Sequence, residues 1–115
     1  MLIAKRAARG IARFSFDELC NKPCGAADFL AIASRFHTVM IDDVPKLEAA
    51  ERDAAKRFVV LVDSLYEHKV NLFASAAVPP DELYAHGDTA FEFERTVSRL
   101  MEMQAEDYLD SPHIP

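Results

Sequence analysis

The amino-acid sequence predicts an α/β fold, a small three-layer-like domain with a short, mainly parallel sheet and crossover helices. Short apolar runs of strand length alternate along the chain with longer segments of helical periodicity, the pattern of strands joined by crossover helices. The chain has 115 residues, half of them apolar, which is enough for one compact core and too little for two. We therefore expect a single domain over residues 1–115.

The first half of the chain predicts a turn, a helix and a strand. Phe16 to Leu19 starts a short turn that breaks at the Pro and Gly residues that follow. Ala26–Arg35 has helical spacing of its apolar residues and should bury Phe29, Leu30, Ile32 and Ala33. His37–Ile41 is apolar and β-branched, which favours a strand, and Pro45 should end its pairing.

The longest predicted helix covers Leu47–His68. Its apolar residues follow i, i+3, i+4, i+7 spacing, at positions 47, 50, 54, 58, 61, 62 and 65. Its second half is apolar on every face, as a strand can be, but the length and the charged turns before it favour a buried crossover helix. Val70–Ala76 predicts the next strand, and Asp81 and Glu82 should open a short helix at Leu83–Tyr84.

The last helix is predicted over Phe91–Leu109, after a loop at His86–Asp88. The face expected to pack against the sheet carries Val97, Leu100, Met101, Gln104 and Tyr108. The opposite face carries Arg95, Arg99, Glu102 and Glu106. Two prolines in Ser111–Pro115 predict that the tail frays.

Arg95 and Arg99 lie one turn apart on the polar face of this helix. Like charges at this spacing repel unless a negative group lies near, so the pair invites an anion or an acidic side chain. Acids one turn away on the same helix are one possible set of partners. Another is Asp63, which stands with Tyr66 in the apolar half of the central helix and needs a partner if it is buried. We predict Asp63 and Tyr66 as structural polar partners.

Four segments together resemble the C-terminal region of the AFG-like, ZapE-type AAA+ ATPases. They are Phe14–Cys20, Gly25–Leu47, Arg57–Ala76 and Phe91–Leu109, and the similarity is closest along R-F-x-x-L-V-D-x-L-Y and F-E-R-T-x-S-R-L-x-E-M-Q. The resemblance implies the C-terminal, non-P-loop portion of an ATPase of protein quality control or cell division. It also implies that the chain opens with an N-terminal β-hairpin, two short strands with the turn at Gly10.

The parent family binds and hydrolyses ATP with magnesium, but this chain lacks the phosphate-binding loop. None of its three glycines is followed by lysine, so G-x-x-x-x-G-K-[ST] is absent. We predict no catalytic residue, metal or cofactor for the chain and no ATP hydrolysis by the chain alone. The resemblance makes Arg95, Arg99 and Arg57 candidates to face nucleotide phosphates across a domain or subunit boundary, where a guanidinium stabilises the transferred phosphoryl group.

Other polar residues are weaker candidates for a metal, nucleotide or redox site. Asp42 and Asp43 end a predicted strand, as a magnesium-binding acid does in such ATPases, and Ser75 ends the next one in the place of a polar sensor residue. Without a P-loop, solvated acids before a proline turn are the default interpretation. Cys20 and Cys24 have neither the spacing of a redox motif nor the second pair of a zinc site, so we expect ordinary thiols in a reducing cytosol.

Net charge and hydropathy indicate where the protein is located and which classes of partner it can bind. The net charge of −6 argues against a nucleic-acid partner, although the first thirteen residues are basic. No apolar run approaches the ~20 residues that span a bilayer. We expect a cytoplasmic protein that packs against an ATPase core or another subunit of an oligomer.

Two alternatives remain open. A stand-alone interaction module would form a homodimer through an exposed apolar face. A small metal-dependent enzyme would use Asp42, Asp43 and a histidine.

Overall fold

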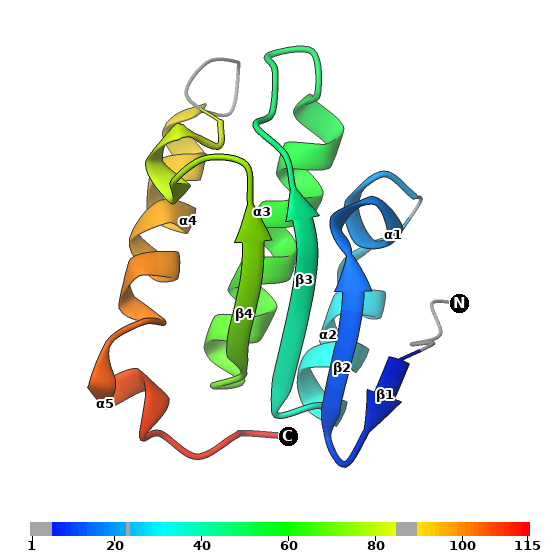
Figure 1. The fold of residues 1–115 in the computed structure, drawn as a ribbon, viewed down its shortest axis with the longest axis vertical. Coiled ribbons are helices and arrows are strands. Elements are labelled where there is room, and N and C mark those ends of the chain that lie inside the picture. The colour runs from blue at the N-terminus through cyan, green and yellow to red at the C-terminus, as the bar shows by residue number, and fades with distance from the viewer. Residues whose placement is uncertain (1–5, 23, 85–89) are drawn as a thin grey trace.

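A computed structural model describes residues 6–22, 24–84 and 90–115, without the side chains of Arg6, Ala90 and Phe91. Figure 1 shows the arrangement of its helices and strands. In chain order these are β1 (Arg6–Ala8), β2 (Ile11–Ser15), α1 (Phe16–Cys20), α2 (Ala26–Arg35), β3 (Thr38–Val44), α3 (Arg52–Glu67), β4 (Asn71–Ala76), the 3₁₀ turn η1 (Pro80–Glu82), α4 (Ala90–Glu102) and α5 (Glu106–Leu109).

The strands form one sheet in the order β1-β2-β3-β4. β1 pairs antiparallel with β2, and β2, β3 and β4 are parallel. Gly10 makes the hairpin turn at φ 81°, and a Cβ on it would lie 2.6 Å from a ring carbon of His37, so both the backbone angle and the space require glycine. The α/β class, the mainly parallel sheet, the N-terminal hairpin and the crossover helices are confirmed.

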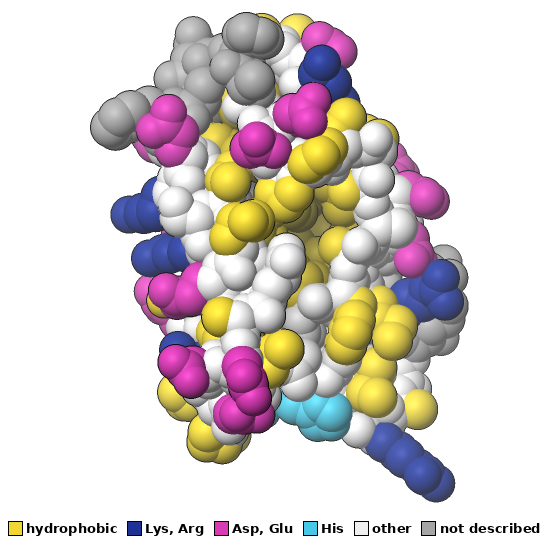
Figure 2. All heavy atoms as spheres, turned by 60° about the vertical axis from the view of Figure 1, so that its left-hand side comes forward, with side chains coloured by type: hydrophobic (Ala, Val, Ile, Leu, Met, Phe, Trp, Pro, Cys, Tyr) yellow, Lys and Arg dark blue, Asp and Glu magenta, His cyan; other side chains and the backbone are white. Residues whose placement is uncertain are grey.

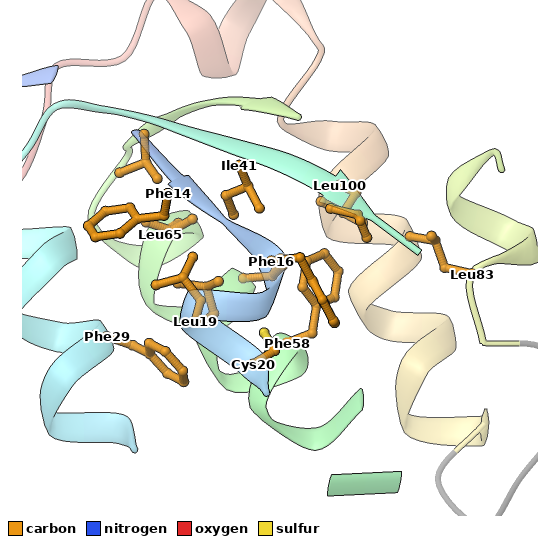
Figure 3. Close-up of a cluster of buried hydrophobic side chains, with 14 of the residues drawn as sticks. Phe14, Phe16, Leu19, Cys20, Phe29, Ile41, Phe58, Leu65, Leu83 and Leu100 are labelled. Carbon is orange, nitrogen blue, oxygen red and sulfur yellow. The ribbon is translucent and has the colours of Figure 1, made fainter. Parts of the chain in front are cut away.

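Helices α2 and α3 lie behind the sheet in Figure 1 and cover one of its faces. Strand residues alternate between this face and the open one, so Phe14 and Ile41 enter the core while Arg13 and Met40 lie on the other face. Figure 3 shows Phe14 and Ile41 meeting side chains from α1, α2 and α3. The described residues thus form two of the three expected layers, a sheet and a helical layer.

Three expectations about the first helices and strands need correction. α2 has the expected bounds, but Leu30 is 51% exposed because it lies about 100° around the helix from Phe29. Phe16 begins a helix rather than a turn, since Ser15 and Glu18 form a reciprocal capping box at 3.1 and 2.9 Å. β3 continues past Ile41 through a bulge to Val44, which pairs with Ala76 before Pro45 stops it.

The central helix begins later than predicted, at Arg52 rather than Leu47. Leu47 is buried all the same, but it lies in a segment without regular secondary structure, and its N–H donates to the Leu83 carbonyl at 2.7 Å. Ala50 is exposed. The apolar spacing therefore identified a buried position whose neighbours are not helical. The short helix expected at Leu83–Tyr84 is a single 3₁₀ turn just before it.

The last predicted helix is two helices. α4 ends at Glu102, the next three residues turn, and α5 follows. The break brings Tyr108 under the end of α3, where its hydroxyl donates to the carbonyls of Leu65 and Val70 at 3.2 and 2.7 Å. No Gly or Pro marks this break in the sequence.

The buried face of α4 is also different from the expected one. It consists of Phe93, Thr96 and Leu100, and Met103 in the turn after α4 is buried as well. Met101 is 57% exposed, and Gln104 is exposed. This face packs against α3 and η1 rather than on the sheet. The Phe93 ring stacks on Phe58 of α3 with centroids 6.0 Å apart.

The C-terminal tail does not fray as expected. The Ile114 N–H donates to the His68 carbonyl at 2.8 Å, and a ring nitrogen of His113 lies 2.7 Å from the Ala33 carbonyl. The tail therefore joins the ends of α2 and α3. The loop predicted at His86–Asp88 lies outside the described residues.

Candidate functional site

The predicted site residues of α3 and α4 face one another across the contact between these helices. Asp63 and Tyr66 lie one turn apart on α3, and Arg95, Arg99 and Glu102 follow at four- and three-residue steps on α4. Such spacings place each set on one side of its helix. These five residues are called the arginine cluster below.

Asp63 lies between the two arginines. Arg99 Nη1 donates a hydrogen bond to Asp63 Oδ1, and Arg95 Nη2 lies 3.5 Å from Oδ2. The exposed fractions of the two arginine side chains are 23% for Arg99 and 66% for Arg95. Arg99 is thus engaged inside the protein, while most of the Arg95 side chain faces solvent.

Tyr66 connects the two helices a second time. Its hydroxyl donates to Glu102 Oε2, and this hydrogen bond is the main reason why the pKa of Tyr66 is raised. The Arg99 guanidinium carbon lies 5.0 Å from the centre of the Tyr66 ring, a cation–π distance. Glu102 therefore accepts its hydrogen bond from Tyr66, whereas Arg99 pairs with Asp63.

Sequence reasoning missed two neighbours of the cluster, Lys69 and Tyr108. The Tyr108 ring stacks on Tyr66 with centroids 5.8 Å apart, and Lys69 Nζ lies 5.1 and 5.2 Å from the two ring centres. Burial raises the pKa of Tyr108. Their placement depends on the break before α5 and on the φ of 56° at Lys69, and neither is visible in the sequence pattern.

Arg57 does not join the other two candidate arginines. Its Nη1 donates to the Cys20 carbonyl at 3.0 Å, which links α3 to the end of α1. Burial raises the pKa of the Cys20 thiol to about 12, so the thiol is neutral at physiological pH. Cys20 and Cys24 are both free thiols.

The polar residues at the carboxyl ends of β3 and β4 bond within the protein. Asp42 accepts two hydrogen bonds from Arg13 at 2.7 and 3.1 Å, and this pairing raises the pKa of Arg13. Asp43 has φ 60°, and its N–H donates to Ser75 Oγ at 2.9 Å across the bulge. Within the described residues no three His, Cys, Asp or Glu side chains gather in a way that could hold a metal ion.

The other notable feature is an apolar groove between β4 and α4. It has a volume of about 360 Å³ and appears as the hollow near the centre of Figure 2, with hydrophobic side chains around it. Its walls are formed by Val44, Phe58, Leu72, Phe73, Ala74, Ala76, Pro80, Leu83, Leu100, Met103 and Gln104. We call it the β4 groove. Sequence reasoning did not find it, because the residues come from five separate segments.

Comparison with known proteins gives the family. The AFG1-like ATPase family matches residues 1–112. Cell division protein ZapE of Escherichia coli K12 is 44% identical over 100 residues, covering 87% of this chain and 27% of ZapE. Lactation elevated protein 1 homolog B of Danio rerio is 37% identical over 130 residues, covering 85% of this chain and 26% of that protein.

An uncharacterized Schizosaccharomyces pombe protein is 32% identical over 139 residues, covering 96% of this chain and 31% of the relative. The chain thus spans between a quarter and a third of the length of the curated relatives it matches. No solved structure matches it. Among the described residues, no helix is both long and apolar enough to cross a membrane. With almost its whole length matched by the family model, the chain belongs to the AFG1-like ATPase family.

Proposed function

We propose that this chain is an accessory domain, the non-P-loop portion of an AFG1-like ATPase that acts in cell division. In this role it packs against the nucleotide-binding core or another subunit and does not itself hydrolyse ATP. The observation that carries the proposal is the β4 groove with the open sheet beside it. A domain that shares only a quarter to a third of its relatives' length and leaves such an apolar surface uncovered is suited to contact the rest of the ATPase.

Three further observations support this proposal. The sequence has no phosphate-binding loop, the motif that holds the nucleotide phosphates in P-loop ATPases. Parallel strands occur almost only in sheets covered on both faces, yet here Phe73 is 59% exposed on the face away from the helices. The longer relative ZapE is named as a cell division protein, and this chain itself matches the AFG1-like ATPase family.

Arg95 is the residue best placed to serve nucleotide bound elsewhere in the ATPase. Its guanidinium is exposed and only weakly held by Asp63, whereas Arg99 and Arg57 already donate to groups within the domain. An arginine that reaches across a boundary stabilises charge on phosphate only if its guanidinium is free to turn outward. We therefore keep Arg95 as the nucleotide-facing candidate and assign Arg99 and Arg57 to holding the helices together.

Two measurements test this function. Calorimetric titration of the chain with Mg-ATP should give no saturable heat, and micromolar binding would contradict the accessory role. The chain should also form a stable complex, detected by light scattering after size exclusion, with the region of E. coli ZapE that lies outside the match. Failure of the two parts to associate, with each part folded, would overturn the proposal.

A homodimeric interaction module is the second candidate function. The same exposed Phe73 and β4 groove favour it, because a second copy could cover them as well as an ATPase core could. Self-association that rises with concentration and ignores nucleotide would identify this function. A chain that stays monomeric at 100 times the concentration needed for complex formation with the ZapE region would exclude it.

A further inference from the structure

β4 ends the sheet, and one of its edges has no neighbouring strand among the described residues. The N–H groups of Asn71 and Ala77 donate towards β3, to the carbonyls of His37 and Val44 at 2.8 and 2.9 Å. Successive residues of a strand direct their backbone polar groups to opposite edges. Phe73 and Ser75 have the same orientation as Asn71 and Ala77. The N–H and C=O groups of the alternate residues, Leu72, Ala74 and Ala76, therefore point to the outer edge.

In the part of the chain that the structure describes, this outer edge is flanked by α4 only across the groove (Figure 1), and β4 lacks the charged side chains and prolines by which many proteins protect an exposed edge strand. Natural edges carry charged side chains or prolines, or they are covered, because unpaired backbone groups attract other strands. The sequence of β4, Asn-Leu-Phe-Ala-Ser-Ala, contains no charge and no proline, and its last four residues are exposed. A strand of this composition needs a partner.

The β4 groove lies along the same edge. Leu72, Ala74 and Ala76 line its sheet side, and Leu100 of α4 and Met103 of the turn after α4 line the opposite side. The small side chains at 74 and 76 leave the groove open, and its volume of about 360 Å³ falls within the range of about 300–1,000 Å³ that ligand pockets have. The edge thus offers hydrogen bonds, and the groove beside it offers an apolar surface for alternate side chains, the two elements of strand addition.

Charge at the ends of the groove limits what can bind. Among the residues that the structure describes, no Lys, Arg, Asp or Glu lines the groove itself. Figure 2 shows acidic side chains above and below the hollow, and the nearby elements η1 and α5 carry Asp81, Glu82, Glu106 and Asp107. A binding segment with an apolar middle and basic residues at its flanks would complement this surface.

We propose that an extended segment from the rest of the ATPase polypeptide adds to the outer edge of β4 as a fifth strand. The segment has apolar residues at alternate positions, which enter the groove, and Lys or Arg at its flanks. We assign the segment to the same ATPase because more than two thirds of the length of each relative lies outside the part that this chain matches. This inference rests on the proposed packing against the ATPase and names the contact by which it occurs.

The test uses overlapping 14-residue synthetic peptides that cover the part of E. coli ZapE outside the match. Each peptide is titrated into the folded chain, and binding is followed by fluorescence anisotropy and by hydrogen exchange of the β4 amides. We expect one peptide or one overlapping set, apolar in the middle and basic at the flanks, to bind and to protect Leu72, Ala74 and Ala76. If no peptide binds at millimolar concentration, the inference is overturned.

Matched variants separate strand addition from simple apolar contact. Ala74→Pro removes one outward N–H while leaving the β3 side of the strand intact, and Ala74→Gly keeps that N–H. We expect Ala74→Pro to weaken the best peptide at least tenfold and Ala74→Gly to weaken it less than threefold. Equal binding by both variants would overturn strand addition.

A second pair of controls does not depend on whether Ala74→Pro folds. The best peptide is N-methylated at alternate positions in two versions, one of which blocks the amides that face β4. Only that version should lose binding, and equal affinity for both versions would contradict the proposal. The chain and the ZapE region could also form a complex in which the β4 amides are not protected from hydrogen exchange. That result would support the accessory function and contradict the addition of a fifth strand.

Discussion

The helix-covered side of the sheet and its outer strand β4 are built from similar apolar residues but are closed to very different degrees. On the covered side, Phe14, Val39 and Ile41 are at most 1% exposed. At β4, the residue Phe73, which pairs in register with Met40, is 59% exposed. The first region is complete by itself, whereas the second still has apolar surface and backbone groups to be covered.

The difference shows which contacts hold this domain together and which are available for another part of the ATPase. Phe58 is the centre of the closed region, since its ring lies 5.8 Å from that of Phe16 and 6.0 Å from that of Phe93. Those rings come from α1, α3 and α4, so a single side chain joins three helices. Among the described residues, no side chain of β4 joins three helices in this way.

The largest effect is expected from Phe58→Ala, which should break the closed region. Phe58 is 2% exposed, and truncating a buried phenylalanine costs about 3–5 kcal/mol of unfolding free energy. Urea denaturation followed by circular dichroism measures the loss. A cost below about 1 kcal/mol would mean that the two regions are packed equally loosely.

The second largest effect on the free energy of unfolding is expected from raising the pH, which should destabilise the closed region. Burial raises the pKa of Cys20 from 9.0 to about 12, so above pH 9 the unfolded chain loses a proton that the folded chain keeps. Stability is therefore full below pH 9 and falls as the pH rises towards 12, with a loss from Cys20 of about 2 kcal/mol between pH 8 and 10.5. The raised pKa values of Tyr66 and Tyr108 act in the same direction.

Urea titrations at the two pH values measure this loss, and Cys20→Ala is the control. The variant should be less stable at pH 8 because it leaves a small cavity, but it should lose less on going to pH 10.5. An identical loss in the variant would exclude Cys20 as a source of the pH dependence.

Asp63→Asn tests the joint between α3 and α4 and should have a smaller effect. It removes the charge that Arg99 and Arg95 share, and we expect a loss of about 1 kcal/mol because the carboxylate is partly screened by solvent. Arg95→Met is the matched control, since a largely exposed arginine should contribute almost nothing to stability. Both values come from urea denaturation, and an equal cost for the two variants would contradict the assignment of Arg99 as the principal partner.

The smallest effect on stability is expected from Phe73→Ala. Because its ring is exposed, we expect a change below about 0.5 kcal/mol in the free energy of unfolding. The same change should weaken the complex with the ZapE region several-fold. A variant that loses stability but keeps the complex would reverse the roles given to the two regions.

Much of the fold could be predicted because its signals are local. The bounds of α2 follow from its apolar spacing, and the parallel strands follow from short apolar runs on either side of a long helix. The pairing of Asp63 with an arginine of the last helix was also foreseeable, since a partly buried acid and two adjacent cations each need a partner.

The remaining features depend on contacts between distant residues. The end of α4 at Glu102 has no local stop signal and is set by where Tyr108 finds the carbonyls at the end of α3. The burial of Leu47 without a helix depends on the Leu83 carbonyl, thirty-six residues further along the chain. The separation of Arg57 from the other arginines depends on which side of α3 meets α1.

Motifs and hydrophobic periodicity lie in short segments, so they were enough to predict the family, the α/β class and the absence of a phosphate-binding loop. The open edge of the sheet and the position of the groove could be found only from the folded chain, since the groove combines β3, β4, η1, α3 and α4. Periodicity shows that a residue has an apolar face to cover, but the covering partner is fixed only when distant segments come together. At β4 that partner is not provided by the described part of this chain.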